Sequence, residues 1–241
     1  MDKILCQYLG GSHLYGLNGP DSDEDIRGIF MNTDPSYILG LNRFDEHRKI
    51  KDGEDIVYKE VSPFIRLLKK ANTEALEVLF APNSSFNKST KEFDFIRGYT
   101  WRLLDSEKLF KCLMGYMQGE LRLALGIRKG KIGGKRYAQV EKLGFSPKNF
   151  TQLFRLAYVG IFFFTTNRFI VDTSQFPASI YKLLRDVKFK PEEFEKDWME
   201  EKARDLESQL RDCFQHRMRD YTFDERVANH ILLELYKPYL K

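Results

Sequence analysis

The chain of 241 residues is long enough to bury a core in one or two domains. Hydrophobic residues make up 42% of it and charged residues 31%, which excludes a wholly disordered chain. The formal net charge of +4 is compatible with a polyphosphate or nucleic-acid partner, but it is far from that of a histone-like tail.

The apolar runs and the cysteines indicate in which cellular compartment the protein is expected. The apolar run at 158–164 is too short to span a bilayer, so we expect a buried helix there and no membrane partner. The start of the chain has no basic segment followed by a long apolar stretch, which predicts a cytoplasmic protein. Cys6, Cys112 and Cys213 are widely spaced, which argues against a disulfide framework and a zinc site.

β-Forming residues interrupted by turns dominate the beginning of the chain. They predict strands over 4–9, 25–31 and 55–61. Between the first two strands, Gly10, Gly11 and Ser12 suit the start of a short helix, and residues 18–21 suit a turn.

From residue 62 onward the pattern becomes helical. Ser62 is expected to cap the first of these helices, with Pro63 in its first turn. Further helices are expected near 74–80, 89–104, 106–127, 147–167, 177–187, 192–219 and 223–237. The basic, glycine-rich stretch 129–136 predicts a flexible loop, which either grips nucleic acid nonspecifically or is simply solvated. The helix over 192–219 is expected to be an amphipathic surface helix.

Two carboxylates stand two residues apart at the start of the second expected strand. Side chains at i and i+2 of a strand point to one face, so Asp23 and Asp25 are expected side by side. Such a pair repels itself unless a cation lies between the two groups. Carboxylate oxygens suit Mg²⁺, or Mn²⁺ in its place, so the pair predicts a metal site.

Gly11 and Ser12 lie where a strand passes into a helix. Free backbone N–H groups and the helix dipole favour an anion there, such as the phosphates of a nucleoside triphosphate. A phosphate cradle beside a metal site is suited to in-line attack at an α-phosphorus, with two metal ions binding the attacking and leaving oxygens. A third carboxylate is then expected on a neighbouring strand.

The segment 9–28 contains the motifs Gly11-Ser12, Tyr15-Gly16 and Ser22-Asp23-x-Asp25-x-Arg27-Gly28. Together they resemble the signature of the DNA polymerase β-like nucleotidyltransferase superfamily. More narrowly, the chain resembles the nucleotidyltransferases predicted in bacteria and large phages. In that narrower family a strand beginning with Asp, a helix and an Asn…Leu-Glu motif follow. This chain supplies Asp55 to Glu60, then Phe64 to Leu68, then Asn72 to Glu77.

The resemblance also implies a later helix that carries Lys, His and Arg. Lys148 and Arg155 match that pattern, and Gln152 stands at the His position. On a helix these three side chains form one polar stripe, which is either solvated or a basic wall that binds the triphosphate or an acceptor.

Several residues in the β-rich first part of the chain have two possible interpretations. Asp55 is favoured as the third carboxylate, because Glu60 falls on the opposite strand face and could cap the next helix. Arg27 shares the face of the two carboxylates and either neutralises them or contacts a phosphate. Tyr15 is expected to pack rather than stack on a base. Asn72 and Glu77 are expected to fix their helix against the β-rich first part of the chain.

We therefore expect an α+β fold, with a small mixed-sheet nucleotidyltransferase domain over 1–82 and a helical domain over 83–241 that closes the cleft. Asp23, Asp25 and Asp55 would be catalytic and bind the metal; Gly11, Ser12, Arg27, Lys148 and Arg155 would bind nucleotide. The reaction would transfer a nucleoside monophosphate from ATP or another nucleoside triphosphate to an acceptor hydroxyl. An RNA end, tRNA included, is the first candidate acceptor. A protein hydroxyl, as in AMPylation, and a noncatalytic nucleotide- or RNA-binding regulator are the alternatives.

Overall fold

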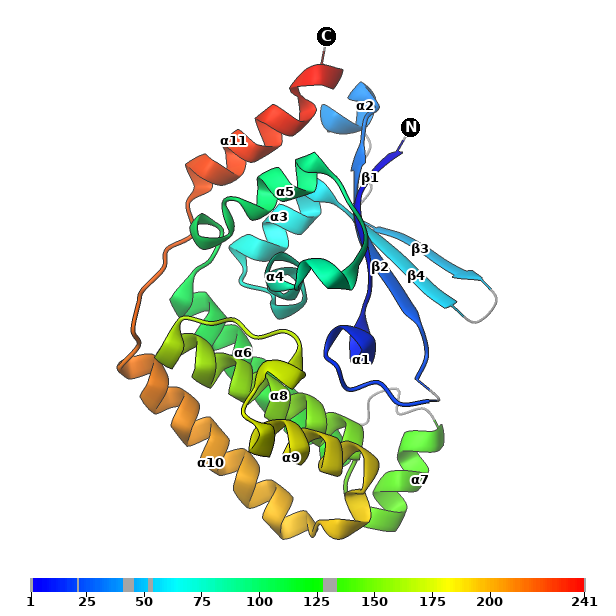
Figure 1. The fold of residues 1–241 in the computed structure, drawn as a ribbon, viewed down its shortest axis with the longest axis vertical. Helices are drawn as coiled ribbons and strands as arrows, with labels where there is room; N and C mark the ends of the chain where they lie inside the picture. The colour runs from blue at the N-terminus through cyan, green and yellow to red at the C-terminus, as the bar shows by residue number, and fades with distance from the viewer. Residues whose placement is uncertain (1, 21, 41–45, 52–53, 128–133, 241) are drawn as a thin grey trace. The chain divides into compact units, whose positions relative to one another are not determined.

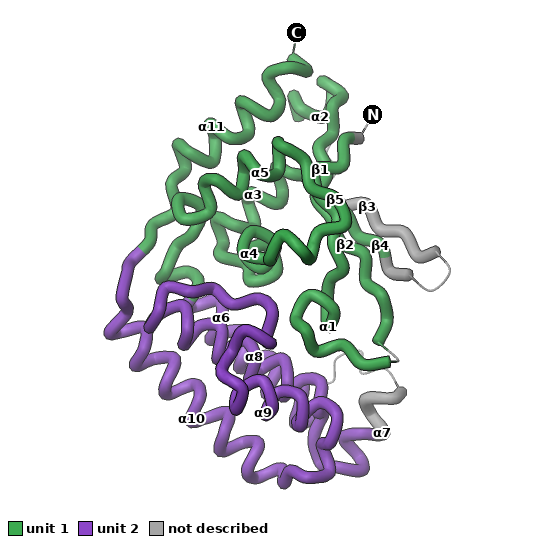
Figure 2. The backbone as a smooth tube through the Cα atoms, viewed as in Figure 1, with its two compact units in different colours: residues 1–109, 221–241 green, residues 110–220 purple. Residues whose placement is uncertain are grey.

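The computed structural model describes residues 2–20, 22–40, 46–51, 54–127 and 134–240. The chain forms two compact units (Figure 2). We call residues 1–109 together with 221–241 the sheet unit, and residues 110–220 the helical unit.

The sheet unit is built on a five-stranded mixed sheet in the order β3-β4-β2-β1-β5 (Figure 1). Strands β2 and β4 are parallel, whereas the β1·β2, β1·β5 and β3·β4 pairs are antiparallel. The mixed sheet confirms the expected α+β class. The strands are β1 (Asp2–Leu9), β2 (Asp25–Asn32), β3 (Glu46–Lys51), β4 (Glu54–Glu60) and β5 (Phe86–Ser89).

Helices α3, α4 and α5 lie along the same side of this sheet (Figure 1). Helix α3 begins two residues earlier than expected, because its cap is Glu60 rather than Ser62. The Glu60 carboxylate accepts a hydrogen bond from the Ser62 N–H at 2.7 Å. The helices of the sheet unit are α1 (Gly11–Leu14), α2 (Pro35–Ile38), α3 (Val61–Lys69), α4 (Thr73–Phe80), α5 (Lys91–Arg97) and α11 (Glu225–Tyr236).

The helical unit packs its longer helices around aromatic and aliphatic side chains. Phe163 and Phe164 of α8 are buried, as the sequence predicts for that cluster. A Cβ added at Gly160 of α8 would lie 2.6 Å from the Cδ1 atom of Leu210 of α10, so glycine lets the two helices pack closely without a shift of this leucine. The helices are α6 (Ser106–Ala124), which begins in the sheet unit, α7 (Gly134–Leu143), α8 (Pro147–Thr166), α9 (Ala178–Phe189) and α10 (Lys196–Gln215).

Two segments of the chain differ from the sequence-based expectations. The helix expected over 89–104 ends at Arg97, and a 3₁₀ turn over Thr100–Arg102 follows. The loop expected over 129–136 lies partly outside the described residues, and from Gly134 onward the chain is already helix α7. Among the helices that the structure describes, none is both long and apolar enough to cross a membrane.

The expected domain boundary at residue 82 does not coincide with the division into compact units. Strand β5 pairs with β1, and the Thr90 N–H donates to the Leu5 carbonyl at 3.0 Å, so this segment stays with the sheet. At the other end of the chain, Tyr236 donates a hydrogen bond to Glu60, which brings α11 back to the same unit.

Candidate active site

The register between β2 and β4 determines which residues share a face of the sheet. Asp25 pairs with Asp55, and two residues further along Arg27 pairs with Val57. Paired positions on neighbouring strands lie on one face, and every second residue along a strand returns to it. Positions 25, 27 and 29 of β2 therefore share a face with positions 55, 57 and 59 of β4.

This face forms the floor of a cavity of about 390 Å³ within the sheet unit. The cavity contains both acidic and basic side chains, and helices α3 and α4 form its wall. Its lining residues are Tyr8, Gly10, Gly11, Leu14, Tyr15, Asp25, Arg27, Gly28, Ile29, Val57, Lys59, Phe64, Glu74, Ala75, Glu77 and Val78.

The glycines after β1 let the backbone lie directly against the side chains of β2. The Gly10 N–H donates to the Asp25 carbonyl at 2.7 Å, which fixes the loop to the start of β2. Gly11 has a φ of +57°, and a Cβ added there would lie 2.6 Å from the Oδ2 atom of Asp25. Both the backbone conformation and the lack of space therefore require glycine at position 11.

The first turn of α1 offers hydrogen-bond donors at this place. Within the part of the chain that the structure describes, no group accepts a hydrogen bond from the backbone N–H of Gly11 or Ser12. Unpaired N–H groups are usual in the first turn of a helix, where they favour an anion. The donors expected from the sequence are thus next to the Asp25 carboxylate.

Arg27 forms an ion pair with Asp25 across the face that they share. Its Nη2 atom lies 3.2 Å from the Asp25 Oδ1 atom, and Nη1 donates to the Ile26 carbonyl at 3.1 Å. Both side chains are partly exposed, so the pair stays accessible from the cavity. The structure thus shows the neutralising interaction that was one of the two interpretations of Arg27.

Two contacts tie helix α4 to other parts of the cavity lining. The Tyr15 hydroxyl donates to the Glu77 carboxylate at 2.8 Å, and the Glu77 residue is only 2% exposed. Lys59 of β4 lies 3.3 Å from Glu74 of α4. The contact of Glu77 supports its expected role in fixing α4 against the rest of the sheet unit, whereas the packing role of Tyr15 stays a prediction.

Lys59 and Tyr8 line the cavity although the sequence analysis did not select them as site residues. Lys59 stands four residues after Asp55, so the period of two along the strand was a signal for it. Burial raises the pKa of the Tyr8 phenol well above its usual range, so the group is neutral at physiological pH.

A comparison with known protein families shows which family the chain matches. A family model described as the RNA repair pathway DNA polymerase beta family matches residues 2–233. The chain belongs to this family. It is therefore a polymerase β-like nucleotidyltransferase, which confirms the resemblance of the segment 9–28.

Among solved structures, this nucleotidyltransferase is similar to a nucleotidyltransferase-like protein from Exiguobacterium sibiricum. The identity is 10% and the TM-score is 0.31, over 98% of this chain and 74% of that chain. No curated protein matches the chain significantly. The family assignment rests on the family model.

The three expected catalytic carboxylates of the nucleotidyltransferase have different positions. Asp25 lines the cavity and begins β2. Asp23 precedes that strand and is exposed, so alternation along β2 does not by itself place it beside Asp25, and its position next to that carboxylate stays a prediction. Asp55 has a described backbone, but its side chain lies outside the described part. Among the described residues, no group of three acidic, His or Cys side chains could hold a metal.

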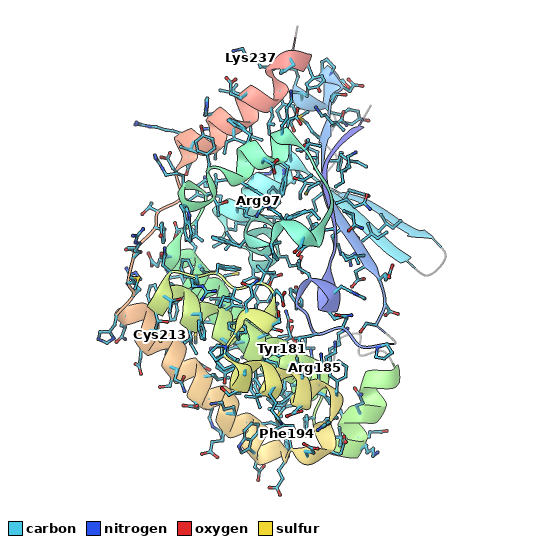
Figure 3. All side chains as sticks on the ribbon, viewed as in Figure 1. Arg97, Tyr181, Arg185, Phe194, Cys213 and Lys237 are labelled. Atoms are coloured by element: carbon cyan, nitrogen blue, oxygen red, sulfur yellow. The ribbon has the colours of Figure 1, made fainter. Side chains whose placement is uncertain are left out.

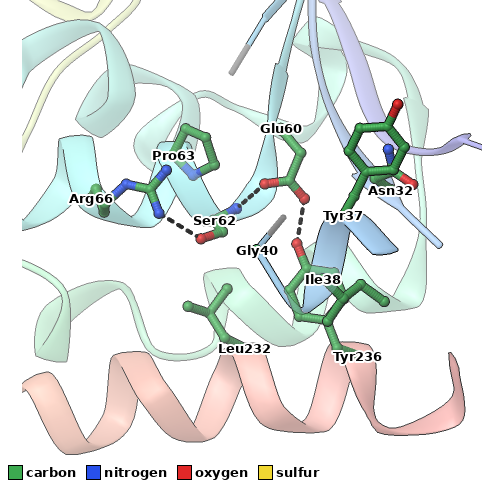
Figure 4. Close-up of a pocket in the computed structure, with 10 residues that line it drawn as sticks. All are labelled: Asn32, Tyr37, Ile38, Gly40, Glu60, Ser62, Pro63, Arg66, Leu232 and Tyr236. Atoms are coloured by element: carbon green, nitrogen blue, oxygen red, sulfur yellow. Dashed lines mark hydrogen bonds between the residues drawn. The ribbon is translucent and has the colours of Figure 1, made fainter. Parts of the chain in front are cut away.

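Glu60 of the nucleotidyltransferase belongs to a different cavity, of about 290 Å³ (Figure 4). There its carboxylate caps α3 and accepts a hydrogen bond from the Tyr236 hydroxyl. The residue is 6% exposed, and burial raises the pKa of its carboxyl above the ordinary 4.5. This position supports the helix-cap interpretation of Glu60 over the role of third carboxylate.

The expected stripe on α8 lies in the helical unit of the nucleotidyltransferase. Lys148 is exposed, but Arg155 is only 1% exposed and donates to Gln152 at 3.1 Å. A solvated stripe of three side chains is therefore wrong, because the helix turns its Arg155 face into the core of the unit. Lys148 is the exposed member of the three, and Gln152 is partly exposed.

Proposed function

We propose that the enzyme transfers a nucleoside monophosphate from a nucleoside triphosphate to an acceptor hydroxyl, and that the acceptor is an RNA end. The acceptor oxygen forms a bond to the α-phosphorus, the bond from that phosphorus to the bridging oxygen breaks, and pyrophosphate leaves. The observation that supports this proposal is the close approach of Gly11 to Asp25, at the strand position paired with Asp55.

The residues of the cavity suit the parts of this reaction. The backbone N–H groups of Gly11 and Ser12 would hold phosphate oxygens at the start of α1. Arg27 and Lys59 supply positive charge on the cavity floor, where a triphosphate brings negative charge. Asp55 would accept the proton of the attacking hydroxyl.

The donor chemistry fits a hard divalent cation, Mg²⁺ or Mn²⁺. Asp25 directs one carboxylate oxygen to Arg27 and the other toward the backbone of Gly11, and position 55 shares its face of the sheet. Carboxylate oxygens together with substrate phosphates are the usual ligands of Mg²⁺. Asp23, Asp25 and Asp55 would hold the metal, which when bound polarises the phosphate oxygens and neutralises charge in the transition state.

RNA is the favoured acceptor for two reasons. The matching family is described by its place in RNA repair, and the net charge of +4 suits a nucleic-acid partner. Lys148 is an exposed cation that would contact the triphosphate or the acceptor backbone. Arg155, which is buried, would support α8 rather than contact the nucleotide.

To test this proposal, the purified protein is incubated with each of the four labelled nucleoside triphosphates, together with tRNA or cell extract. The measured quantity is the label transferred to RNA or to protein. The double variant Asp23→Asn with Asp25→Asn should lose about a thousandfold in rate, because several kcal/mol of charge stabilisation disappear. Asp197→Asn with Asp212→Asn removes the same charge from exposed positions of α10 and should label normally. Unchanged labelling by the first variant would reject the proposal.

The same experiment separates the other candidate functions. Label in protein instead of RNA would assign the acceptor to a protein hydroxyl. A noncatalytic regulator would produce no label with any nucleotide. Calorimetry would then show nucleoside triphosphate binding that does not depend on Mg²⁺, whereas the proposed enzyme needs the metal for tight binding.

A further inference from the structure

Helix α9 of the helical unit carries two differently charged faces. On one face, Lys182 forms an ion pair with Asp186, and the Nζ atom of Lys190 lies 3.8 Å from the other oxygen of Asp186. We call these three residues the paired face. The Asp186 carboxylate balances one of the two lysine charges, and the Glu193 carboxylate lies 3.6 Å from the Nζ atom of Lys190.

The second face combines cations with aromatic rings. Tyr181, Arg185, Lys188 and Phe189 stand at i, i+4, i+7 and i+8, so they project from one side of α9. The Arg185 guanidinium lies 5.1 Å from the centre of the Phe189 ring, and the Lys188 ammonium lies 5.2 Å from it. We call these four residues the aromatic-basic face; Figure 3 labels Tyr181 and Arg185 on it.

Lys148 adds a third positive charge from α8. Partial burial lowers the pKa of Lys188 from its ordinary value, and the charges of Lys148 and Arg185 lower it further. The charge of Arg185 acts on the Asp186 carboxylate of the paired face, but within the described part of the chain no ion pair contact of 4.0 Å or less joins Lys148 or Arg185 to a carboxylate. Like charges held close together cost free energy, and a bound polyanion would relieve that cost.

The aromatic rings indicate which class of polyanion fits this face. Phe189 is 41% exposed at the end of α9, where it offers a ring surface beside the cations. A strand of nucleic acid presents phosphates at regular spacing and bases that stack on aromatic side chains. An acidic peptide would satisfy the cations but would leave the ring exposed. In a duplex the bases stack on one another and do not reach such a ring.

We propose that the aromatic-basic face, with Lys148, binds a single-stranded segment of the acceptor RNA. Arg185, Lys188 and Lys148 contact phosphates, and a base stacks on Phe189. This assignment rests on the proposed function, because it takes RNA as the acceptor. It adds the place on the helical unit where the acceptor strand is held.

The experiment measures the binding of a fluorescently labelled single-stranded RNA to the full chain by anisotropy at several salt concentrations. Arg185→Gln with Lys188→Gln should weaken binding about tenfold and lower the salt slope by about 1.4, for two lost phosphate contacts on a single strand. Lys182→Gln with Lys190→Gln removes the same charge from the paired face and should change binding by less than about twofold. Phe189→Ala should weaken binding about tenfold, through the lost stacking.

The outcomes separate this proposal from the proposed function. The Asp23→Asn, Asp25→Asn chain should bind RNA normally while its transfer activity is lost. RNA binding at this face without any transfer to RNA would reject the proposed acceptor and keep the binding surface. Equal weakening by both charge variants, no weakening by Arg185→Gln with Lys188→Gln, or polyglutamate binding as tightly as RNA would overturn the inference.

Discussion

Gly11 lies directly against the Asp25 carboxylate in the candidate active site. The left-handed conformation of Gly11 turns the chain out of β1, and the missing side chain leaves room for the Asp25 carboxylate. Any side chain at position 11 would meet two separate costs. One is the backbone strain of a positive φ, and the other is a displaced carboxylate.

The variant Gly11→Ala should show both costs. Backbone strain should lower the free energy of unfolding by about 1–2 kcal/mol. The new Cβ should also displace Asp25, and a shift of about 1 Å in a reacting group lowers the rate about a hundredfold. Thermal unfolding and nucleotide transfer measure the two effects separately.

Gly126→Ala is the matched control for this variant. Gly126 also has a positive φ, of +67°, but its nearest neighbour to an added Cβ is Val140 at 3.5 Å, an ordinary contact. This variant should lose comparable stability and keep its transfer rate. Equal rate losses in both variants would show that global destabilisation, rather than the position of Asp25, lowers the rate.

The alternation of side chains along a strand predicted part of this site from the sequence. It placed Arg27 on the face of Asp25, and the ion pair confirms that. It does not determine the position of Asp23, because alternation applies only inside a strand and β2 begins at Asp25. The contact between Tyr15 and Glu77 spans 62 residues, and its geometry depends on tertiary packing that no local pattern encodes.

At the scale of elements, Glu60 joins three segments of the sheet unit. It ends β4, its carboxylate caps α3, and it accepts a hydrogen bond from Tyr236 of α11. A carboxyl in this position is costly to ionise, because burial removes it from water. Its protonation state therefore affects the stability of the unit.

The variant Glu60→Gln should reveal this cost as a dependence of stability on pH. The folded-state pKa of Glu60 is raised above the ordinary 4.5, so folding favours the protonated carboxyl. The stability of the unchanged protein relative to Glu60→Gln should be greatest below pH 4.5 and should fall as the pH rises through the raised pKa. Urea unfolding midpoints at a series of pH values measure the difference.

Glu92 provides a control of opposite sign. The hydrogen bond and charge of Lys3 hold the pKa of its carboxyl below 4.5. The stability of the unchanged protein relative to Glu92→Gln should therefore be present above pH 4.5 and should be lost as the pH falls through the lowered pKa. A difference for Glu60→Gln with the same sign as that for Glu92→Gln would contradict the burial argument.

The lengths of the elements explain which of them could be predicted from sequence. Helices α8 and α10 are long and have a clear apolar period, and their expected positions are confirmed within a few residues. Strand β5 has only four residues, three of them polar, so no alternation indicated it. Helix α7 begins in a glycine-rich basic stretch that resembles a loop by composition.

At the scale of the whole molecule, the order of the chain does not follow its compact units. The helical unit is one continuous segment, whereas the sheet unit takes residues from both ends of the chain. The family motifs recognised in the sequence end near residue 82, and this suggested a boundary there. Patterns of secondary structure, however, do not show that α11 returns to the sheet unit, because that depends on long-range contacts of Asp224 and Tyr236.

Removal of α11 should therefore weaken the sheet unit selectively. A chain that ends at Asp220 loses the hydrogen bonds between Tyr221 and Ser106, the Asp224 ion pair with Arg102, and the buried side chains of Ile231 and Leu235. The two buried aliphatic side chains alone contribute about 1.5–3 kcal/mol each. Hydrogen exchange should accelerate in β1, α3 and α5.

A chain that ends at Lys237 is the control, because it keeps the whole of α11 and loses only the last residues. Its exchange should match that of the full chain in every element of the sheet unit. In the shorter chain, α8 and α10 should keep their protection, since their contacts lie within residues 110–220 and proteins open in cooperative local units. Uniform loss of protection in both units of the shorter chain would mean that the two units unfold as one.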